Sequence, residues 1–339
     1  MIWLTWRQHR AEAGVGAAIL AVIVAGLLVI GIDARHTATA VGLTRCTRAG
    51  TDCGSALEAL HRHYHWIPPV TATLIALPLL AGMFWGAPLI SREFEAGTHR
   101  LVWTQSISRV RWMSSKLAII LGVTTITGVA LGLVAGWALT PLAPAFGTRL
   151  GSGWFEIQGI VPAAYVLFAL AAGVAAGAIL RRTIPAMAVT LVAYAVARFP
   201  VHYLRKQLLP TRTHTVTFPL GAIVRNLTSA NTSSPFPSSG LSPNDWVLKT
   251  TVLGPPGHAD PLNAVQTACP NLPRGATFGS PPVNACLAKV AGLKARMVTE
   301  YQPAGRFWSL QAVECLIFLA VAVALIGASI VVVKRTRSL

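Results

Sequence analysis

Long apolar runs constrain the fold of this chain more than any other feature of its sequence. An α-helix rises about 1.5 Å per residue, so about 20 apolar residues cross a hydrocarbon layer of about 30 Å. Six such runs cover residues 13–32, 67–90, 117–139, 157–180, 184–204 and 307–333. The sequence therefore predicts an all-α polytopic membrane protein with six transmembrane helices, located in the cell membrane.

Composition argues against the other classes of fold. Of the 339 residues, 53% are hydrophobic and only 12% are charged, whereas about a quarter of the residues in a soluble domain are charged. Disorder requires low hydrophobicity and is excluded as well. The net charge of +17 would suggest nucleic acid binding in a soluble protein. In a membrane protein, basic residues retained on the cytoplasmic side give the same excess, so the expected partner is the lipid bilayer and not nucleic acid.

Basic residues also predict the orientation of the helices, because Lys and Arg near the ends of spans stay in the cytoplasm. Arg149 is the one basic residue in the connection between spans three and four, whereas the opposite side collects many. The long segment before the last span also holds basic residues, but long segments cross regardless of charge. Both termini are therefore predicted to be cytoplasmic. The segments are an interfacial 1–12, an external 33–66, a cytoplasmic 91–116, an external 140–156, an external 205–306 and a cytoplasmic tail 334–339.

Four of the five cysteines lie in segments predicted to be external, on the oxidising side where disulfides persist. Cys46 and Cys53 are in the first external segment, and Cys269 and Cys286 are in the last. Pairing within each segment is the economical arrangement, although four cysteines permit three pairings.

The segment 205–306 is dense in Pro, Ser, Thr and Gly. It is predicted to be a small, loop-rich, partly stranded domain closed by a disulfide. Alternating Val, Leu and Thr residues predict a strand over 246–253. A helix is predicted over 285–299, leading towards the last span.

Catalytic motifs are missing from the sequence. It has no phosphate-binding loop with Gly, four residues, Gly, Lys and Ser or Thr, and neither a His-Glu-x-x-His nor a Gly-x-Ser-x-Gly motif. We therefore expect no enzymatic activity and no cofactor in this chain. His61, His63 and His65 are the one cluster that hints at a metal, because side chains two apart share a face of a strand. An interfacial run of aromatic rings is the favoured interpretation, and no metal site is expected.

Two charged residues fall within predicted spans. Glu314 lies about 10 Å from the outer end of the last span, and Arg198 lies about 20 Å from the cytoplasmic end of the fifth. In a layer of about 30 Å these depths coincide. Each charge would cost about 3 kcal/mol near the centre if it were unpaired. We therefore expect the two side chains to face one another or to line a wet cavity, with structural pairing favoured over contact with a substrate.

The cytoplasmic stretch 91–116 is the most informative part of the sequence. Two acidic residues, a Gly-Thr pair and an apolar run follow one another there, namely Glu93, Glu95, Gly97, Thr98, Leu101 and Trp103. This stretch resembles the permease subunits of ABC-type exporters, a six-span family in which a Glu-x-Gly-Thr segment after the second span leads into a short coupling helix. The entry to the last span, from Tyr301 to Trp308 with Gln311 after it, is similar to the actinobacterial branch of that family.

The resemblance implies a permease that works as a pair, with an identical second chain expected, and with separate cytoplasmic ABC ATPase subunits that bind ATP and Mg. It implies export of a lipophilic drug, lipid or peptide by alternating access. Glu93 and Glu95 would pair with basic residues of the ATPase, Gly97 would permit a turn, and Leu101 and Trp103 would offer an apolar docking surface. The alternative is a non-transporting membrane signalling or scaffold protein that acts through its external domain.

Overall fold

The computed structural model describes residues 2–49, 53–97, 109–228, 235–237, 239–242, 244–258, 260–273 and 276–335. For residues 2–13, 47–49, 109, 110, 112 and 115 it describes the backbone alone. The chain forms two compact units. The first consists of Met1–Leu208 together with Gly305–Leu339, and the second of Leu209–Ala304.

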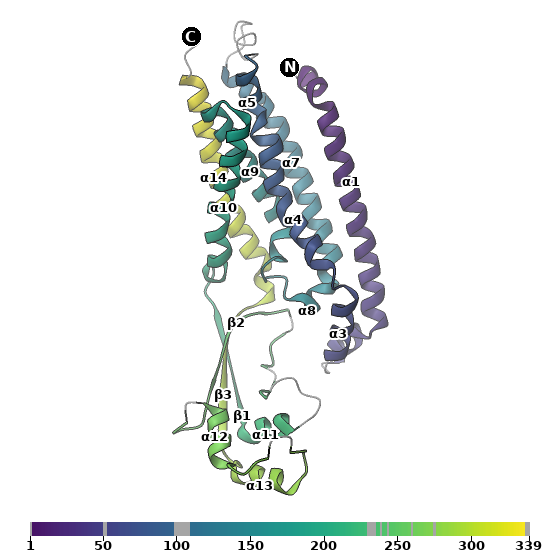
Figure 1. Ribbon diagram of the computed structural model, residues 1–339, viewed down its shortest axis with the longest axis vertical. Helices are drawn as coiled ribbons and strands as arrows, with labels where there is room; N and C mark the ends of the chain where they lie inside the picture. Colours follow the sequence, from purple (N-terminus) through teal and green to yellow (C-terminus); the bar gives the residue numbers. More distant parts are fainter. Residues whose placement is uncertain are drawn as a thin grey trace. The chain divides into compact units, whose positions relative to one another are not determined.

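Six helical stretches of the first unit are long and apolar enough to cross a membrane, and Figure 1 shows them running side by side. They are α1 (Ile2–Ala40), α4 with η1 and α5 (Ile67–Ala81, Gly82–Gly86 and Pro88–Glu95), α7 (Arg109–Leu139), α9 (Val161–Leu180), α10 (Thr183–Leu204) and α14 (Phe307–Arg335). Each predicted span falls on one of them. The prediction of six membrane helices is therefore confirmed.

Two helix boundaries differ from those predicted. The helix of the first span begins before the predicted span, because α1 runs without a break from Ile2 to Ala40. The junction is Ala11-Glu12-Ala13, and all three residues favour a helix. At the fourth span the helix begins at Val161 and not at 157, because Gly159 has a φ of +70° and Pro162 occupies the first turn.

The second span is irregular near its middle, where a proline interrupts the helical hydrogen bonds. Between α4 and α5 the chain forms the π-helical turn η1, in which Ala87 N donates to Gly82 O at 2.9 Å. Pro88, the first residue of α5, has no N–H to donate, so the wider turn rearranges the hydrogen bonds just before it. Half of the most apolar stretch of this span is buried among the other helices.

Helix α9 lies at the centre of the first unit, with 78% of its most apolar stretch buried. It packs against α14, α7, α10 and the second span. Glycines permit the backbones of neighbouring segments to approach one another closely. A Cβ added at Gly173 would lie 2.5 Å from Gly82 O, and one added at Gly132 on α7 would lie 2.1 Å from Gly159 O. The small residues that recur along α7 and α9 therefore serve packing within the chain.

The connections of the first unit are short helices: α2 (Leu43–Ala49), α3 (Gly54–His63), η2 (Thr140–Leu142), α8 (Ala143–Phe146), η3 (Phe155–Ile157) and η4 (Arg205–Gln207). Cys46 is bonded to Cys53 between α2 and α3. The histidine cluster lies on and just after a helix, where His61 stacks on Phe146 with 4.8 Å between ring centroids. Within the described residues, no group of three His, Cys, Asp or Glu side chains could hold a metal ion.

The second unit is built on a three-stranded antiparallel sheet of order β1-β3-β2, formed by β1 (Arg212–Pro219), β2 (Trp246–Leu253) and β3 (Lys294–Gln302). Helices α11 (Leu220–Thr228), α12 (Pro261–Ala268) and α13 (Pro281–Lys289) complete it, and a 3-10 turn, η5 (Ala304–Arg306), leads to α14. Cys269 is bonded to Cys286. The sheet and the disulfide agree with the partly stranded, disulfide-closed domain that the sequence predicts for this segment.

The predicted strand over 246–253 is confirmed as β2. The predicted helix over 285–299 is wrong beyond Lys289, where α13 ends. Gly292, with a φ of +85°, lies in the turn, and the chain then enters the central strand β3. In β3 the side chains of Ala295, Met297 and Thr299 alternate inward, and both edges of the strand find partners.

Candidate functional site

The first candidate site is the end of the second span, where α5 finishes at Glu95 and Gly97 turns the chain with a φ of +67°. Glu93, Glu95 and Gly97 are placed together there. Thr98, Leu101 and Trp103 lie outside the described residues. The positive φ gives a physical reason for glycine at position 97, because other residues rarely adopt this conformation.

Glu93 connects α5 to α7. Its Oε1 accepts a hydrogen bond from Nζ of Lys116, which lies in the second turn of α7. The side chains are 21% and 8% exposed, so this is a largely buried ion pair. A substitution that removes one partner would leave the other charge largely buried and without its ion-pair partner, which destabilises the fold.

Glu95 connects α5 to α10. Its Oε1 accepts from the backbone N of Thr183 at 2.9 Å, and its Oε2 accepts from Thr183 Oγ1 at 2.7 Å. Thr183 is the first residue of α10, and the residue before it, Arg182, supplies no side-chain cap. Glu95 therefore acts as the cap of α10, with its negative charge at the positive end of that helix. Ser91 Oγ is also 2.9 Å from Thr183 Oγ1.

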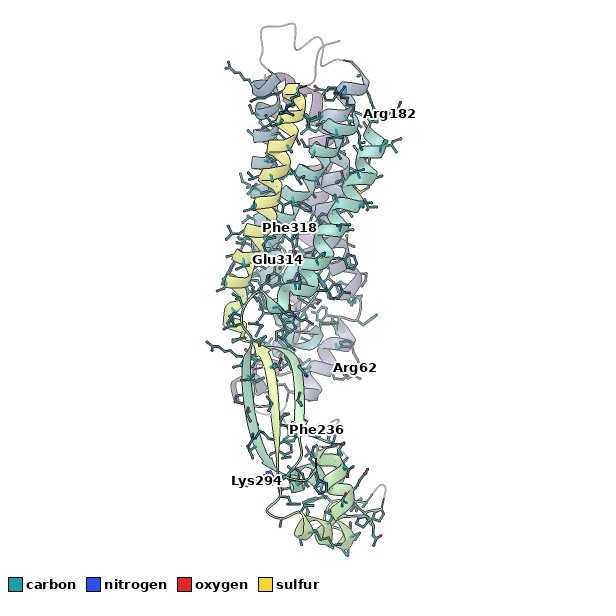
Figure 2. The ribbon with its side chains drawn as sticks, turned by 90° about the vertical axis from the view of Figure 1, so that its left-hand side faces the viewer. Arg62, Arg182, Phe236, Lys294, Glu314 and Phe318 are labelled. Atoms are coloured by element: carbon teal, nitrogen blue, oxygen red, sulfur yellow. A yellow bond between two sulfur atoms is a disulfide. The ribbon has the colours of Figure 1, made fainter. Side chains whose placement is uncertain are left out.

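The second candidate site is a buried cluster of charges that joins α10 to α14. The predicted pair is brought together, with Arg198 Nη1 3.8 Å from Glu314 Oε1. Arg198 Nη2 is also 3.6 Å from Oε2 of Glu156, in the turn before α9. Figure 2 marks Glu314 on α14, one helical turn before Phe318. Phe318 packs edge-on against Tyr165 of α9.

Arg205 and Glu156 are members of this cluster that sequence reasoning missed. Arg205 Nε donates to Glu314 Oε2 at 2.9 Å and its Nη2 donates to Glu156 Oε1 at 2.8 Å, while Arg205 is only 1% exposed. The predicted boundaries of the spans placed Arg205 and Glu156 in external segments. The sequence does contain a pattern that indicates the place of Arg205. It follows Arg198 and His202 at spacings of four and three residues, so the three side chains share one face of a helix.

Polar and aromatic groups complete the cluster. Tyr165 donates a hydrogen bond to Glu314 Oε1, and the guanidinium of Arg198 stacks on the ring of Tyr165 at 3.9 Å. Nearby, Gln311 Oε1 accepts from the backbone N of Ile160 and Val161 at 3.0 and 2.9 Å, which caps α9. Two carboxylates and two guanidiniums balance in charge, and they present almost no surface to a ligand. This network of hydrogen bonds and ion pairs holds α9, α10 and α14 together.

The charge on Glu156 predicts a pH dependence of stability. Burial alone would raise the pKa of Glu156, but the charges of Arg205 and Arg198 outweigh burial and hold this pKa below its usual value. The carboxylate therefore stabilises the fold fully above the unfolded pKa of about 4.3, and this contribution disappears as pH falls through the lower folded pKa. We expect the melting temperature in detergent to fall on acidification, and to fall less steeply in Glu156→Gln. Parallel profiles would contradict this assignment, and Glu58→Gln, at an exposed site, is the control.

Comparison with known proteins identifies the class. The fold is that of a multi-pass membrane protein, and residues 17–205, more than half of the chain, match the family model described as ABC-2 membrane transporter related. The chain belongs to this family. It is therefore a membrane protein related to ABC-2 permeases, which are typically non-catalytic subunits with ATPase partners. Neither a curated protein nor a solved structure matches it. The matched range includes Glu93, Glu95 and Arg198, whereas Glu314 and the second unit lie beyond it.

Proposed function

We propose that this chain is the permease subunit of an ABC exporter. Two identical permease chains would expel a lipophilic drug, lipid or peptide by alternating access, and separate cytoplasmic ATPase subunits would bind ATP and Mg and drive the cycle. Membership of the ABC-2 family carries the proposal. The chain lacks a phosphate-binding loop of its own, so the energy has to come from a partner.

The contacts at the end of α5 support a route for that energy. Glu93 is held by Lys116 of α7 and Glu95 by Thr183 of α10. A force on the loop that follows Gly97 would therefore move the starts of two further helices with the second span. Shifting a two-state pore from mostly closed to mostly open takes about 5.5 kcal/mol of differential binding, which a nucleotide-driven partner can supply.

This arrangement changes the expected roles of the predicted residues. Both carboxylates have partners within the chain, so we assign Glu93 and Glu95 to transmission and not to docking. Docking to the ATPase then falls to the apolar residues of the loop, Leu101 and Trp103, whose side chains would bury apolar area against a partner.

Purification tests the assignment directly. The tagged chain, extracted from its native membrane in mild detergent, is expected to bring down a nucleotide-binding subunit with ATPase activity. Trp103→Asp is expected to lose that subunit, because it places a charge in the docking surface. The matched control is Phe278→Asp, which replaces an aromatic side chain by the same charge at an exposed position of the second unit. Recovery of the wild-type chain without any ATPase would overturn the proposed function.

A charge exchange tests the transmission role. Glu93→Lys alone is expected to lower the ATPase activity of the recovered complex about tenfold, because like charges then meet beside α7. The double variant Glu93→Lys with Lys116→Glu restores opposite charges and is expected to recover most of that activity. Glu58→Lys, at an exposed site in the segment before the second span, is the control. Failure of the exchange to restore activity would show that Glu93 acts on the partner and not on α7.

A further inference from the structure

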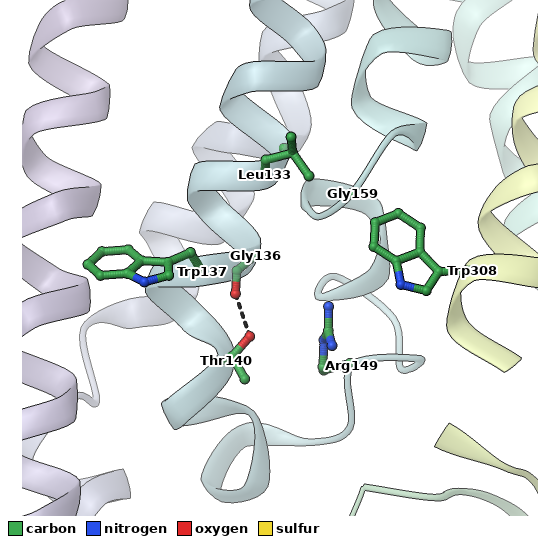
Figure 3. A pocket seen from close by; sticks show the side chains of 8 residues that line it. Leu133, Gly136, Trp137, Thr140, Arg149, Gly159 and Trp308 are labelled. Carbon is green, nitrogen blue, oxygen red and sulfur yellow. Dashed lines mark hydrogen bonds between the residues drawn. The ribbon is translucent and has the colours of Figure 1, made fainter. Parts of the chain in front are cut away.

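A cavity of about 210 Å³ opens between α7 and α14 in the first unit. Figure 3 shows Leu133, Trp137 and Thr140 along α7, Trp308 on the opposite side, and Arg149 from the connection below. Every residue that lines it belongs to the first unit. None of the residues that line the cavity belongs to the end of α5 or to the charge cluster.

The cationic group of this cavity has no carboxylate partner within the described part of the chain. Arg149 Nε donates to Gln158 Oε1 at 3.1 Å, and its guanidinium stacks on the ring of Phe307 at 4.2 Å. Its two Nη atoms donate no hydrogen bond to any described residue. Burial lowers the pKa of the Arg149 guanidinium, and no acidic neighbour offsets this. A guanidinium whose Nη donors have no acceptor can bind a carboxylate or a phosphate.

A second donor lies beside it without an acceptor. Gln158 is fully buried, and its Nε2 has no hydrogen-bond partner among the described residues. It lies behind the wall of the cavity, where a Cβ added at Gly136 would lie 3.7 Å from Gln158 Cβ. A buried amide donor without an acceptor costs free energy, unless a ligand or water supplies one. At the cavity itself, the donors without an acceptor among the described residues are the Nη atoms of Arg149, which favours an anionic ligand.

The rim of the cavity is apolar. Leu133, Trp137 and Trp308 are 50%, 43% and 54% exposed on helices that cross the membrane. Exposed apolar side chains on such helices face lipid, and Trp is enriched where hydrocarbon meets headgroups. A ligand that suits both parts of the cavity has an anionic head and a hydrocarbon tail. A soluble phosphate would leave the apolar rim without a role.

We propose that this cavity binds the phosphate of an anionic phospholipid, held by Arg149, whose guanidinium is positioned by Gln158, with the acyl chains along the apolar rim. On the orientation predicted from the basic residues, this lipid belongs to the outer leaflet. The site is independent of ATP hydrolysis and of the contacts at the end of α5.

Native mass spectrometry of the detergent-purified chain, titrated with phosphatidylglycerol, tests the site. The wild type is expected to retain one lipid per chain. Arg149→Gln keeps a polar side chain but removes the charge, and is expected to bind at least about tenfold more weakly. Arg149→Lys keeps the charge without the planar fork and is expected to be intermediate. Arg62→Gln, which removes a charge from an exposed position in the same outer region, is expected to match the wild type.

Two further ligands distinguish the source of the phosphate. Phosphatidylcholine, whose headgroup carries no net charge, is expected to bind more weakly than phosphatidylglycerol, and millimolar inorganic phosphate is expected not to displace the lipid. Equal retention of phosphatidylglycerol by the wild type and Arg149→Gln would overturn the proposal. Displacement by inorganic phosphate would overturn the lipid as the ligand. Circular dichroism establishes that each variant is folded, and Arg149→Lys serves if Arg149→Gln is not.

Discussion

Glu314→Ala is expected to destabilise the helix bundle by about 3–5 kcal/mol, because it leaves two buried guanidiniums with a single carboxylate. Arg205 loses hydrogen bonds to both oxygens of Glu314, and Tyr165 loses the acceptor for its hydroxyl. The free energy of unfolding, measured by denaturation in detergent micelles, reports the loss. Glu58→Ala removes a carboxylate that is 67% exposed and is expected to change stability by no more than about 0.5 kcal/mol.

A double variant separates charge balance from packing. Glu314→Leu with Arg205→Met removes one charge of each sign and leaves Arg198 beside Glu156, 3.6 Å apart. We expect the double variant to be more stable than either single variant, since replacing both members of a buried ion pair by apolar side chains is often neutral. A double variant that is as unstable as the sum of the two single ones would show that the cluster does not act through charge balance.

Gly132→Ala is expected to destabilise the bundle by about 3 kcal/mol, at the upper end of the usual cost of overpacking. The added Cβ would lie 2.1 Å from Gly159 O, which belongs to the backbone and cannot turn aside. The hydrogen bond of 3.0 Å from Gly159 N to Gly132 O would be strained at the same time. The same denaturation measurement in detergent reports the effect.

Gly122 provides a matched control in the same helix. A Cβ there would meet no atom within 4 Å, so Gly122→Ala gains helix propensity without a clash. We expect its stability to equal or exceed that of the wild type. Equal losses at the two positions would mean that the close contact of α7 with the turn before α9 does not limit packing.

The six spans could be predicted because a long apolar run has few structures open to it in a bilayer, where backbone groups have to bond within the segment. The approach of Arg198 to Glu314 followed from the same rule, since the rise per residue fixes depth along a helix. Neither argument requires knowledge of which helices are neighbours. Arg205 and Glu156 were not predicted to join the pair, because each lies one residue beyond a predicted span and was therefore assigned to an external segment.

The partners of Glu93 and Glu95 could not be predicted in this way. Lys116 and Thr183 lie on other helices, and their approach depends on how α7 and α10 pack around the second span. The strand β3 was missed for a related reason. Its residues follow a helix closely in sequence, and its place in the sheet comes from pairing with β1 and β2, which are distant in the chain.

The burial of α9 restricts how the chain can associate with others. Because its own neighbours cover α9 on nearly every side, this helix offers almost no area to a second permease chain or to a cargo. In the proposed pair, the interface between the chains would have to be formed by the outward faces of peripheral helices such as α1 and α10, whose apolar side chains are largely exposed. In the proposed pair of permease chains, substitutions in α9 are therefore expected to alter the stability of each chain and not the affinity between the two.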